Sequence, residues 1–423
     1  MKDGLVSTQT SLPTKWPEAV PFVFGQADLV VSTLTLSSKV RPSCKAWLEQ
    51  AAREVNQVWN FCNATSDKAW HGRYGGTRKW FSAFDMNALL AGCGEGFQQI
   101  GIDTAQCVSA EHATRRSQFK KSKLRWRKSG GSKRSLGWVP FKAPNLRFKV
   151  DKKEPSRIKV CFLGKSIRLF NAERLLDVYR LAQQGVGKLR AGNFSQDAVG
   201  DWYLNVVIDR VELQLTPVLG PESSIGLDPG QITAMTGSDG RALRSRRYRE
   251  MEPKVQQAQK RAHPGRAKRL SRRVKRQRLD DRNKFCRGVV TDYARVWVGD
   301  LSPKKFAQSK LKGQSKSIHD AALGAAYATL ESMGHRAGRV VGKVNERNST
   351  RCCSNCQALT GPTGLDGNVV RHWACAACGT AHDRDRNSGE NLRHAGEMGW
   401  QNRLSDPGKS VAPRHWRPFA GTR

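Results

Sequence analysis

The fold of the C-terminal half depends on one stretch, which reads VNERNSTRCCSNC at residues 344–356, continues for eighteen residues, and ends CAACGTAHDRDRNSGENL at residues 375–392. It contains two C-x-x-C pairs, Cys353 with Cys356 and Cys375 with Cys378. Each pair places two thiolates on one tight turn, and two such turns complete a tetrahedral zinc site. The spacing therefore predicts a zinc ribbon, whose main role would be to staple together the segments on either side of it.

Acidic residues stand just outside both ends of this ribbon, and closing it brings them near one another. Glu346 precedes the first pair, and Asp383 and Asp385 follow the second. An acid in the first turn of a helix is stabilised by the helix dipole, so we assign that role to Asp383 and predict that Asp385 faces a metal. Glu346 could equally be an ordinary exposed residue, and the pattern by itself leaves both alternatives open.

A further acid, Asp228, ends the apolar strand in SIGLDPG at residues 224–230. A buried carboxylate needs a partner, and a metal ion is the simplest one. The alternative is a turn-capping aspartate before Pro-Gly, since Asp is common in such turns. We favour the metal: Asp228, Glu346 and Asp385 could hold two Mg²⁺ ions about 3.5–4 Å apart, which clamp the attacking and leaving oxygens of a phosphodiester.

The chain is strongly basic, with 73 Lys and Arg against 36 Asp and Glu and a net charge of +37 over 423 residues. Such an excess is unfavourable by self-repulsion unless a polyanion neutralises it, and nucleic acid is the natural partner. No apolar run reaches about 18 residues and no leader is evident, so we expect no membrane association. Eleven cysteines, four of them assigned to zinc, suit a reducing compartment. We expect a cytoplasmic protein that joins the nucleoid when bound to DNA; monomer and homodimer stay open.

Hydrophobic periodicity divides the N-terminal half of the chain. Residues 1–28 read as a flexible lead. Period-two alternation indicates strands in 29–40 and 138–212, which we assign to one β-barrel domain. Helical spacing indicates a helical insertion at 41–137, and residues 213–224 read as a linker.

After the linker, the order strand, hairpin, helix, strand, helix, strand and final helix is that of an RNase H-like α/β domain. We assign 225–348 and 381–395 to this domain, 349–380 to the inserted zinc ribbon, and 396–423 to a flexible basic tail. The predicted fold class is therefore α+β and multidomain.

The segment Arg115–Lys128, RRSQFKKSKLRWRK, is the clearest candidate for contact with nucleic acid. We expect a helix whose charges grip phosphates and whose rings, Phe119 and Trp126, pack in the core; stacking of the rings on bases is the alternative. The residues predicted to bind nucleic acid are Arg115, Arg116, Lys120, Lys121, Lys123, Arg125, Arg127 and Lys128, together with Lys304 and Lys305 farther along the chain.

The C-terminal half, residues 225–392, resembles the RuvC-like nuclease of TnpB-type transposon-associated proteins and of the compact type V CRISPR effectors. The matching pieces, in order, are IGLDPG, VWVGDLSPKKF and the two parts of the stretch quoted above. The N-terminal half matches in layout, as a wedge-like barrel interrupted by a recognition lobe. The resemblance implies an RNA-guided DNA endonuclease that holds a guide RNA, reads a short motif beside its target DNA and lets base pairing select the sequence. It makes Asp228 the first catalytic acid and Asp385 the last.

Two features depart from the pattern of that family. The middle acid is commonly a Glu just before Asp-Leu, where this chain has Gly299; a subset of TnpB-like proteins carries it instead at the V-N-E position, where Glu346 stands. We therefore predict Asp228, Glu346 and Asp385 as the catalytic acids, with Asp300 a substitute that points away from the site. The ending N-S-G-E-N also replaces the usual N-A-A-x-N and puts Gly389 in the helix. This change favours the alternative of a nuclease-inactive RNA-guided repressor, and a zinc-ribbon DNA-binding protein without RNA is a third hypothesis.

Overall fold

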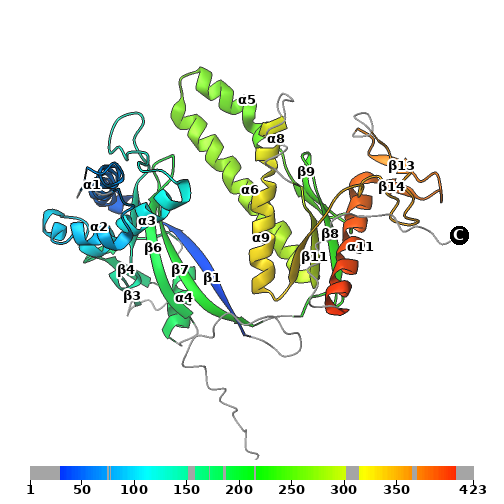
Figure 1. Cartoon of the computed structure of the whole chain (residues 1–423), viewed down its shortest axis with the longest axis horizontal. Helices are drawn as coiled ribbons and strands as arrows, with labels where there is room; N and C mark the ends of the chain where they lie inside the picture. The colour runs from blue at the N-terminus through cyan, green and yellow to red at the C-terminus, as the bar shows by residue number, and fades with distance from the viewer. Residues whose placement is uncertain are drawn as a thin grey trace, which may run out of the picture. The chain divides into compact units, whose positions relative to one another are not determined.

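The computed structural model describes most of the chain as two compact units, Val31–Val211 (unit 1) and Glu212 onward (unit 2), with the start of the first strand assigned to unit 2 (Figure 1). The described residues are 29–73, 76, 78–150, 158–170, 172–183, 187–213, 216–301, 314–363 and 369–405. The predicted lead 1–28, most of the predicted tail, and Lys304 and Lys305 lie outside these ranges.

Unit 1 contains two sheets that share one core. The first has the strand order β1-β7-β6-β2 and the second the order β3-β4-β5. The strands are β1 (Leu29–Lys39), β2 (Trp138–Phe141), β3 (Leu146–Val150), β4 (Ile158–Phe162), β5 (Lys165–Ile167), β6 (Gly187–Gln196) and β7 (Trp202–Leu213), and α4 (Glu173–Gln183) lies between β5 and β6. The rings of Phe141, Phe162 and Phe194 come from both sheets and lie 5.3–5.5 Å apart, so one aromatic cluster joins the sheets.

The helices of unit 1 pack against the same core. They are η1 (Pro42–Cys44), α1 (Lys45–Trp70), α2 (Ala83–Leu89), η2 (Cys93–Gly96) and α3 (Ile102–Phe119), and a further short turn, η3 (Ala143–Asn145), precedes β3. Buried side chains recur every three or four residues along α1, as at Leu48, Ala51, Val55 and Val58, which is the spacing of a one-sided helix. The predicted helical insertion and the sheets therefore form one hydrophobic cluster.

The expected helix over Arg115–Lys128 is wrong beyond Phe119. Lys120 ends α3 in the left-handed conformation, with φ of 51°, and residues 120–137 run on as an irregular connecting segment. The expectation that the two rings pack in the core is also wrong, because Phe119 is 60% exposed and Trp126 is 41% exposed.

Unit 2 is built on a five-stranded sheet with the order β10-β9-β8-β11-β12. The strands are β8 (Ser224–Pro229), β9 (Thr233–Gly237), β10 (Ala242–Arg244), β11 (Arg295–Gly299) and β12 (Val340–Val344). β8, β11 and β12 are parallel, whereas β9 pairs antiparallel with β8, and β10 pairs antiparallel with β9. The predicted order of strands is thus present, as part of a mixed α+β fold.

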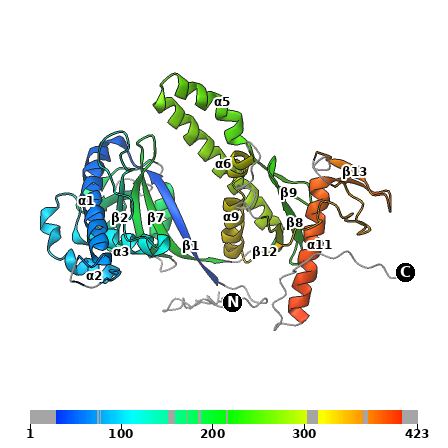
Figure 2. The same cartoon turned by 45° about the horizontal axis from the view of Figure 1, so that its top comes forward.

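Helices cover both faces of this sheet (Figures 1 and 2). They are α5 (Arg247–Lys260), α6 (Pro264–Asp292), α8 (Gln314–Ala321), α9 (Leu323–Arg336) and α11 (Arg384–Ser405). Because side chains alternate along a strand, Val296 and Val298 of β11 pack with α6 and α9, whereas Trp297 between them packs against α11. The hairpin β13 (His372–Ala374) and β14 (Ala381–Asp383) leads directly into α11. No helix among the described residues has the length and apolar character that crossing a bilayer requires.

Candidate active site

The predicted acids gather at one edge of the sheet in unit 2. Strands β8, β11 and β12 run parallel and in register, Leu227 opposite Val298 and Gly299 opposite Val344. Their carboxyl ends therefore meet at the same edge, which is where ligands bind in open α/β sheets. Asp228 stands at this edge on β8, Glu346 follows β12, and Asp385 comes from the first turn of α11.

Asp228 is a buried carboxylate whose neighbours include a hydroxyl, two other acids and the charge of Arg384. It is 9% exposed, and Ser388 Oγ donates a hydrogen bond of 2.6 Å to its Oδ1. Burial raises the pKa of Asp228 to about 8; the Ser388 hydrogen bond opposes this rise, and the negative charges of Asp385 and Glu346 add to it. A concentration of negative charge at a buried position fits a bound cation.

Glu346 occupies the space that a side chain at position 299 would need. A Cβ built on Gly299 would lie 3.0 Å from Glu346 Oε2 and 2.7 Å from Pro229 Cδ. The glutamate after β12 therefore reaches the place beside β11 that Gly299 leaves open. Burial, and then the charge of Asp300, raise the pKa of Glu346 to about 7. Asp300 lies closer than expected: its Oδ1 accepts a hydrogen bond of 3.4 Å from the Glu346 backbone N–H.

The two acids near the start of α11 have different partners. Asp383 Oδ1 accepts a hydrogen bond of 2.9 Å from the backbone N–H of Arg386, which is the helix-end role expected for it. Asp385 is held by Arg371, whose Nη1 lies 3.0 and 3.1 Å from its two oxygens. Among the described residues, the ligand atoms of the four cysteines all lie within 4.8 Å of one another. The carboxylate oxygens of Asp228, Glu346 and Asp385 are more widely spaced than this.

The four cysteine sulfurs are placed as zinc ligands would be. Sγ of Cys353 lies 3.7 Å from Sγ of Cys378, and Sγ of Cys356 lies 3.5 Å from Sγ of Cys375. Zn–S bonds of about 2.3 Å in a tetrahedron place the sulfurs about 3.8 Å apart, so the donor set fits. Cys352 is no competitor, because its Sγ faces the Gln357 backbone oxygen at 3.2 Å.

Parts of the chain are similar to known proteins. The family model described as the Cas12f1-like TNB domain matches residues 325–392, which include Glu346, the four cysteines and Asp385. A putative RNA-guided DNA endonuclease of Streptomyces pristinaespiralis is 28% identical over 217 residues, 48% of this chain and 52% of that protein. The TnpB-like protein L79 of Acanthamoeba polyphaga mimivirus is 27% identical over 138 residues, 30% of this chain and 25% of that protein. The chain is related to the TnpB-like proteins and the compact type V effectors.

A structural comparison extends to most of the chain. The fold is similar to that in the cryo-EM structure of the Cas12f1–sgRNA–target DNA complex, with a TM-score of 0.52, 12% identity, and coverage of 84% of this chain and 83% of that one. In sequence, the match spans about half the length of the Streptomyces protein and a quarter of the mimivirus protein.

The N-S-G-E-N ending, which departs from the TnpB-type pattern, has a structural reason. A Cβ on Gly226 would overlap the backbone oxygen of Gly389, and one on Gly389 would lie 2.8 Å from the Ser238 backbone nitrogen. Gly389 therefore permits α11 to pack closely on β8, which gives its presence in the helix a packing reason. The neighbouring Ser388 supplies the donor to Asp228, a contact that the sequence reasoning missed.

Two asparagines on α11, also missed, join this helix to the zinc ribbon. Asn387 and Asn391 both donate to the backbone oxygen of Cys352, at 2.7 and 2.8 Å. Asn391 also donates to the Ser349 backbone oxygen at 2.7 Å. Because these groups are buried, each lost bond would leave an unpaired polar atom. The two asparagines of N-S-G-E-N were the signal available in the sequence.

The residues predicted to bind nucleic acid divide into internal and exposed ones. Arg116 is only 3% exposed, donates to Ser66 Oγ and the Phe81 backbone oxygen, and is therefore a structural residue and not a phosphate contact. Arg127 donates to Asn56 Oδ1 at 2.6 Å. The side chains of Arg115, Lys120, Lys121, Lys123, Arg125 and Lys128 are exposed.

Proposed function

We propose that this chain is an RNA-guided DNA endonuclease that binds a guide RNA and cleaves target DNA beside a short motif read by the protein. The observation that carries the proposal is the buried Asp228 at the carboxyl end of β8, beside Glu346 and Asp385. A buried acid among other acids, with a hydroxyl as its hydrogen-bond partner, is chemistry for holding cations against a phosphodiester. The names of the related proteins, which include a putative RNA-guided DNA endonuclease, support the same activity.

In this proposal unit 2 is a RuvC-like nuclease with an inserted zinc ribbon, and unit 1 is a wedge domain with a recognition lobe. The strand order β10-β9-β8-β11-β12 supports the assignment of unit 2. An isolated bridge between Val40 and Leu169, which joins the end of β1 to the segment after β5, supports a closed arrangement of the two sheets in unit 1. The exposed cations of unit 1 would contact guide RNA and target DNA.

Asp228, Glu346 and Asp385 would hold Mg²⁺, which when bound supplies charge neutralisation at the phosphate and an activated water. The protein's own contribution is to position these acids. Ser388 orients Asp228 through its 2.6 Å hydrogen bond, and the missing side chain of Gly299 gives Glu346 its place. Arg371 orients Asp385 through the 3.0 Å contact between its Nη1 and Asp385 Oδ1.

The four cysteines would hold zinc in a structural role. The first pair follows Glu346 by a few residues, and the second pair precedes β14, which continues into α11. Zinc would thereby fix the distance between the segment that carries Glu346 and the helix that carries Asp385.

The decisive experiment uses the full chain purified with its co-expressed RNA. Wild-type protein is expected to cut DNA that matches the RNA and to leave other DNA intact. Glu346→Gln keeps the shape and removes the charge, and is expected to lower the cleavage rate by at least about 100-fold with DNA binding retained. The matched control is Glu331→Gln, the same change at an exposed residue of α9, which is expected to cut at the wild-type rate.

Two results would contradict the proposal. Full cleavage by Glu346→Gln would remove this residue from the site, and a wild-type protein that purifies without RNA would favour a zinc-ribbon DNA-binding protein instead. Sequencing of the bound RNA would also separate a repeat-spacer transcript from a transposon-end transcript.

One observation favours a second candidate, a nuclease-inactive RNA-guided DNA-binding protein that acts as a repressor. Arg371 already neutralises Asp385, and the oxygens of the three acids do not all approach within 4.8 Å. This function predicts tight, guide-dependent binding of matching DNA, with no cleavage in Mg²⁺, Mn²⁺ or Ca²⁺.

A further inference from the structure

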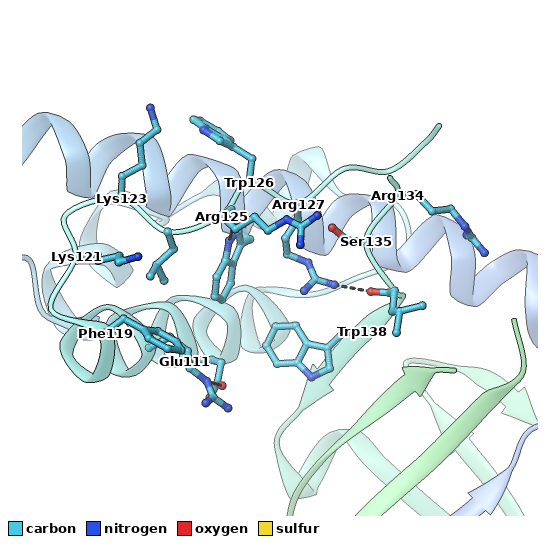
Figure 3. Close-up of a pocket in the computed structure, with 14 residues that line it drawn as sticks. Glu111, Phe119, Lys121, Lys123, Arg125, Trp126, Arg127, Arg134, Ser135 and Trp138 are labelled. Carbon is cyan, nitrogen blue, oxygen red and sulfur yellow. Dashed lines mark hydrogen bonds and ion pairs between the residues drawn. The ribbon is translucent and has the colours of Figure 1, made fainter. Parts of the chain in front are cut away.

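A hollow in unit 1 lies outside the acidic edge and combines aromatic walls with positive charge. It has a volume of about 790 Å³ and is formed by α1, the end of α3, the connecting segment and the start of β2. Figure 3 shows Phe119 and Trp138 along one side of it and Trp126 on the other. Trp59 of α1 contributes to the lining between them. The volume is that of an ordinary small-molecule or nucleotide site.

The wall made by the connecting segment is held by side chains of α1. Asn60 pairs with both backbone groups of Arg127, at 2.9 Å each, and Asn63 pairs with both backbone groups of Leu124, at 2.7 and 2.8 Å. Trp59 Nε1 donates to the backbone oxygen of Arg125 at 3.2 Å. These bonds replace the helical ones that the segment lacks, so the hollow is formed before any ligand binds.

Large aromatic side chains are exposed at this hollow without a packing reason. The buried side of α3 is made by other residues, among them Ala105, Val108 and His112, so Phe119 is not needed for the core. Phe119 is 60% exposed and Trp126 is 41% exposed, although either could gain free energy by burial. Exposed apolar surface beside a preformed hollow is typical of a binding site.

The charges of the hollow identify the kind of ligand. Among the described residues that line it, the acid is Glu111, and its charge is already paired with Arg115 at 2.6 Å. Lys121, Arg125 and Arg134 also line the hollow and have no ion-pair partner within the described part of the chain. An apolar ligand would leave these cations unused, whereas an acidic peptide would not use the rings. A nucleotide satisfies both, because its base stacks on aromatic rings and its phosphate pairs with Lys and Arg.

We propose that this hollow binds an unpaired nucleotide, with the base against Phe119 and Trp126 and the phosphates against Lys121, Arg125 and Arg134. Bases within a duplex stack on their neighbours, so only a single-stranded or extruded nucleotide can enter. The inference rests on the proposed function in one respect, that nucleic acid is the partner, and adds a single-strand contact far in sequence from the acidic edge.

The test measures binding of labelled oligonucleotides by fluorescence anisotropy, with the full chain stripped of nucleic acid and carrying Glu346→Gln to prevent cutting. The probes are a single-stranded DNA of about 12 nucleotides, the RNA of the same sequence and the corresponding DNA duplex. Because stacking contributes about 1–3 kcal/mol per base, Phe119→Ala with Trp126→Ala is expected to weaken single-strand binding by about 10-fold or more and to leave duplex binding within twofold. The stronger of the RNA and DNA responses identifies the source of the nucleotide.

The matched control is Phe84→Ala, which removes a ring that is 86% exposed on α2 and does not line the hollow. It is expected to bind all three probes as the parent does. All of these side chains are exposed, so the variants are expected to unfold at the parent temperature. Single-strand binding by the double variant within twofold of the parent, or an equal loss of duplex binding, would overturn the proposal. Absence of DNA cleavage by wild-type protein would overturn the nuclease proposal and leave this result unaffected.

Discussion

Replacing Gly299 with Ala is expected to damage the acidic edge through one methyl group. The added Cβ would lie 2.7 Å from Pro229 Cδ and 3.0 Å from Glu346 Oε2. Ordinary contacts begin near 3.4 Å, so the proline ring must retreat by about 0.7 Å or the strand must bend. The glutamate can rotate away, but the ring of Pro229 is rigid and moves the adjoining Asp228 with it. Overpacking of this kind costs about 1–3 kcal/mol of unfolding free energy.

The expected effect on cleavage follows from the same displacement. A shift of about 1 Å in a reacting group can lower a rate by about 100-fold, so Gly299→Ala is expected to cut about 10- to 100-fold more slowly in single-turnover assays. Hydrogen–deuterium exchange should increase in β8 and β11. The matched control is Gly324→Ala, which adds the same methyl group at an exposed position in α9 with nothing within 4 Å. The control is expected to gain up to about 1 kcal/mol of stability and to cut normally.

Equal stability and equal cleavage for Gly299→Ala and wild type would refute this reasoning, because the space assigned to Glu346 would then not be limiting. A second comparison sharpens the test. Moving the acid back to the strand, with Gly299→Glu and Glu346→Ala together, is not expected to restore cleavage, since Pro229 would still obstruct any side chain at 299. Restored cleavage in the double variant would show that the Pro229 ring moves aside for a side chain at position 299.

Four further outcomes are expected. Cys356→Ser should lower the zinc content measured by a colorimetric assay and increase amide exchange in β14 and α11, and retention of zinc with unchanged exchange would contradict a four-cysteine site. His112 is buried, and its pKa is lowered to about 4, first by burial and then by the charge of Arg116. The free energy of unfolding that its neutral form contributes is therefore present above its unfolded pKa of about 6.5 and is lost as the pH falls toward 4. Between pH 7 and pH 4, the free energy of unfolding of wild type should therefore fall by about 3 kcal/mol more than that of His112→Gln. An equal fall in both proteins would exclude this residue as the cause. Ser388→Ala should slow cleavage by about 10-fold without weakening DNA binding, because Asp228 loses a hydrogen bond to a charged group. Gly226→Ala should separate α11 from β8 and lower the unfolding temperature more than any change above, so a wild-type melting curve would show that the approach is not close.

The N-S-G-E-N ending keeps α11 in contact with both the sheet and the zinc ribbon, although it departs from the usual N-A-A-x-N pattern. The helix α11 contacts β8 through Gly226 and Gly389, and the asparagines Asn387 and Asn391 connect it to the ribbon. The N-S-G-E-N ending therefore supplies a close approach, a donor to Asp228 and two connections to the zinc-binding turn. None of these functions requires the usual alanines.

The sequence by itself determined the features that depend on spacing along the chain. Two C-x-x-C pairs separated by eighteen residues predicted the cysteine cluster, and strand patterns that end in Asp228 and precede Glu346 predicted acids at one sheet edge. Alternation and helical periodicity likewise predicted the strands and α1, because the spacing of apolar residues along an element indicates which of its sides is buried.

Only the tertiary structure decided which distant residues share a space. The end of α3 at Phe119 depends on Asn60 and Asn63, which bind the backbone of the connecting segment and so compete with further helix. The place of Glu346 depends on the missing side chain of Gly299. Contacts of this kind join residues far apart in sequence through volume and hydrogen-bond geometry, which no local periodicity records.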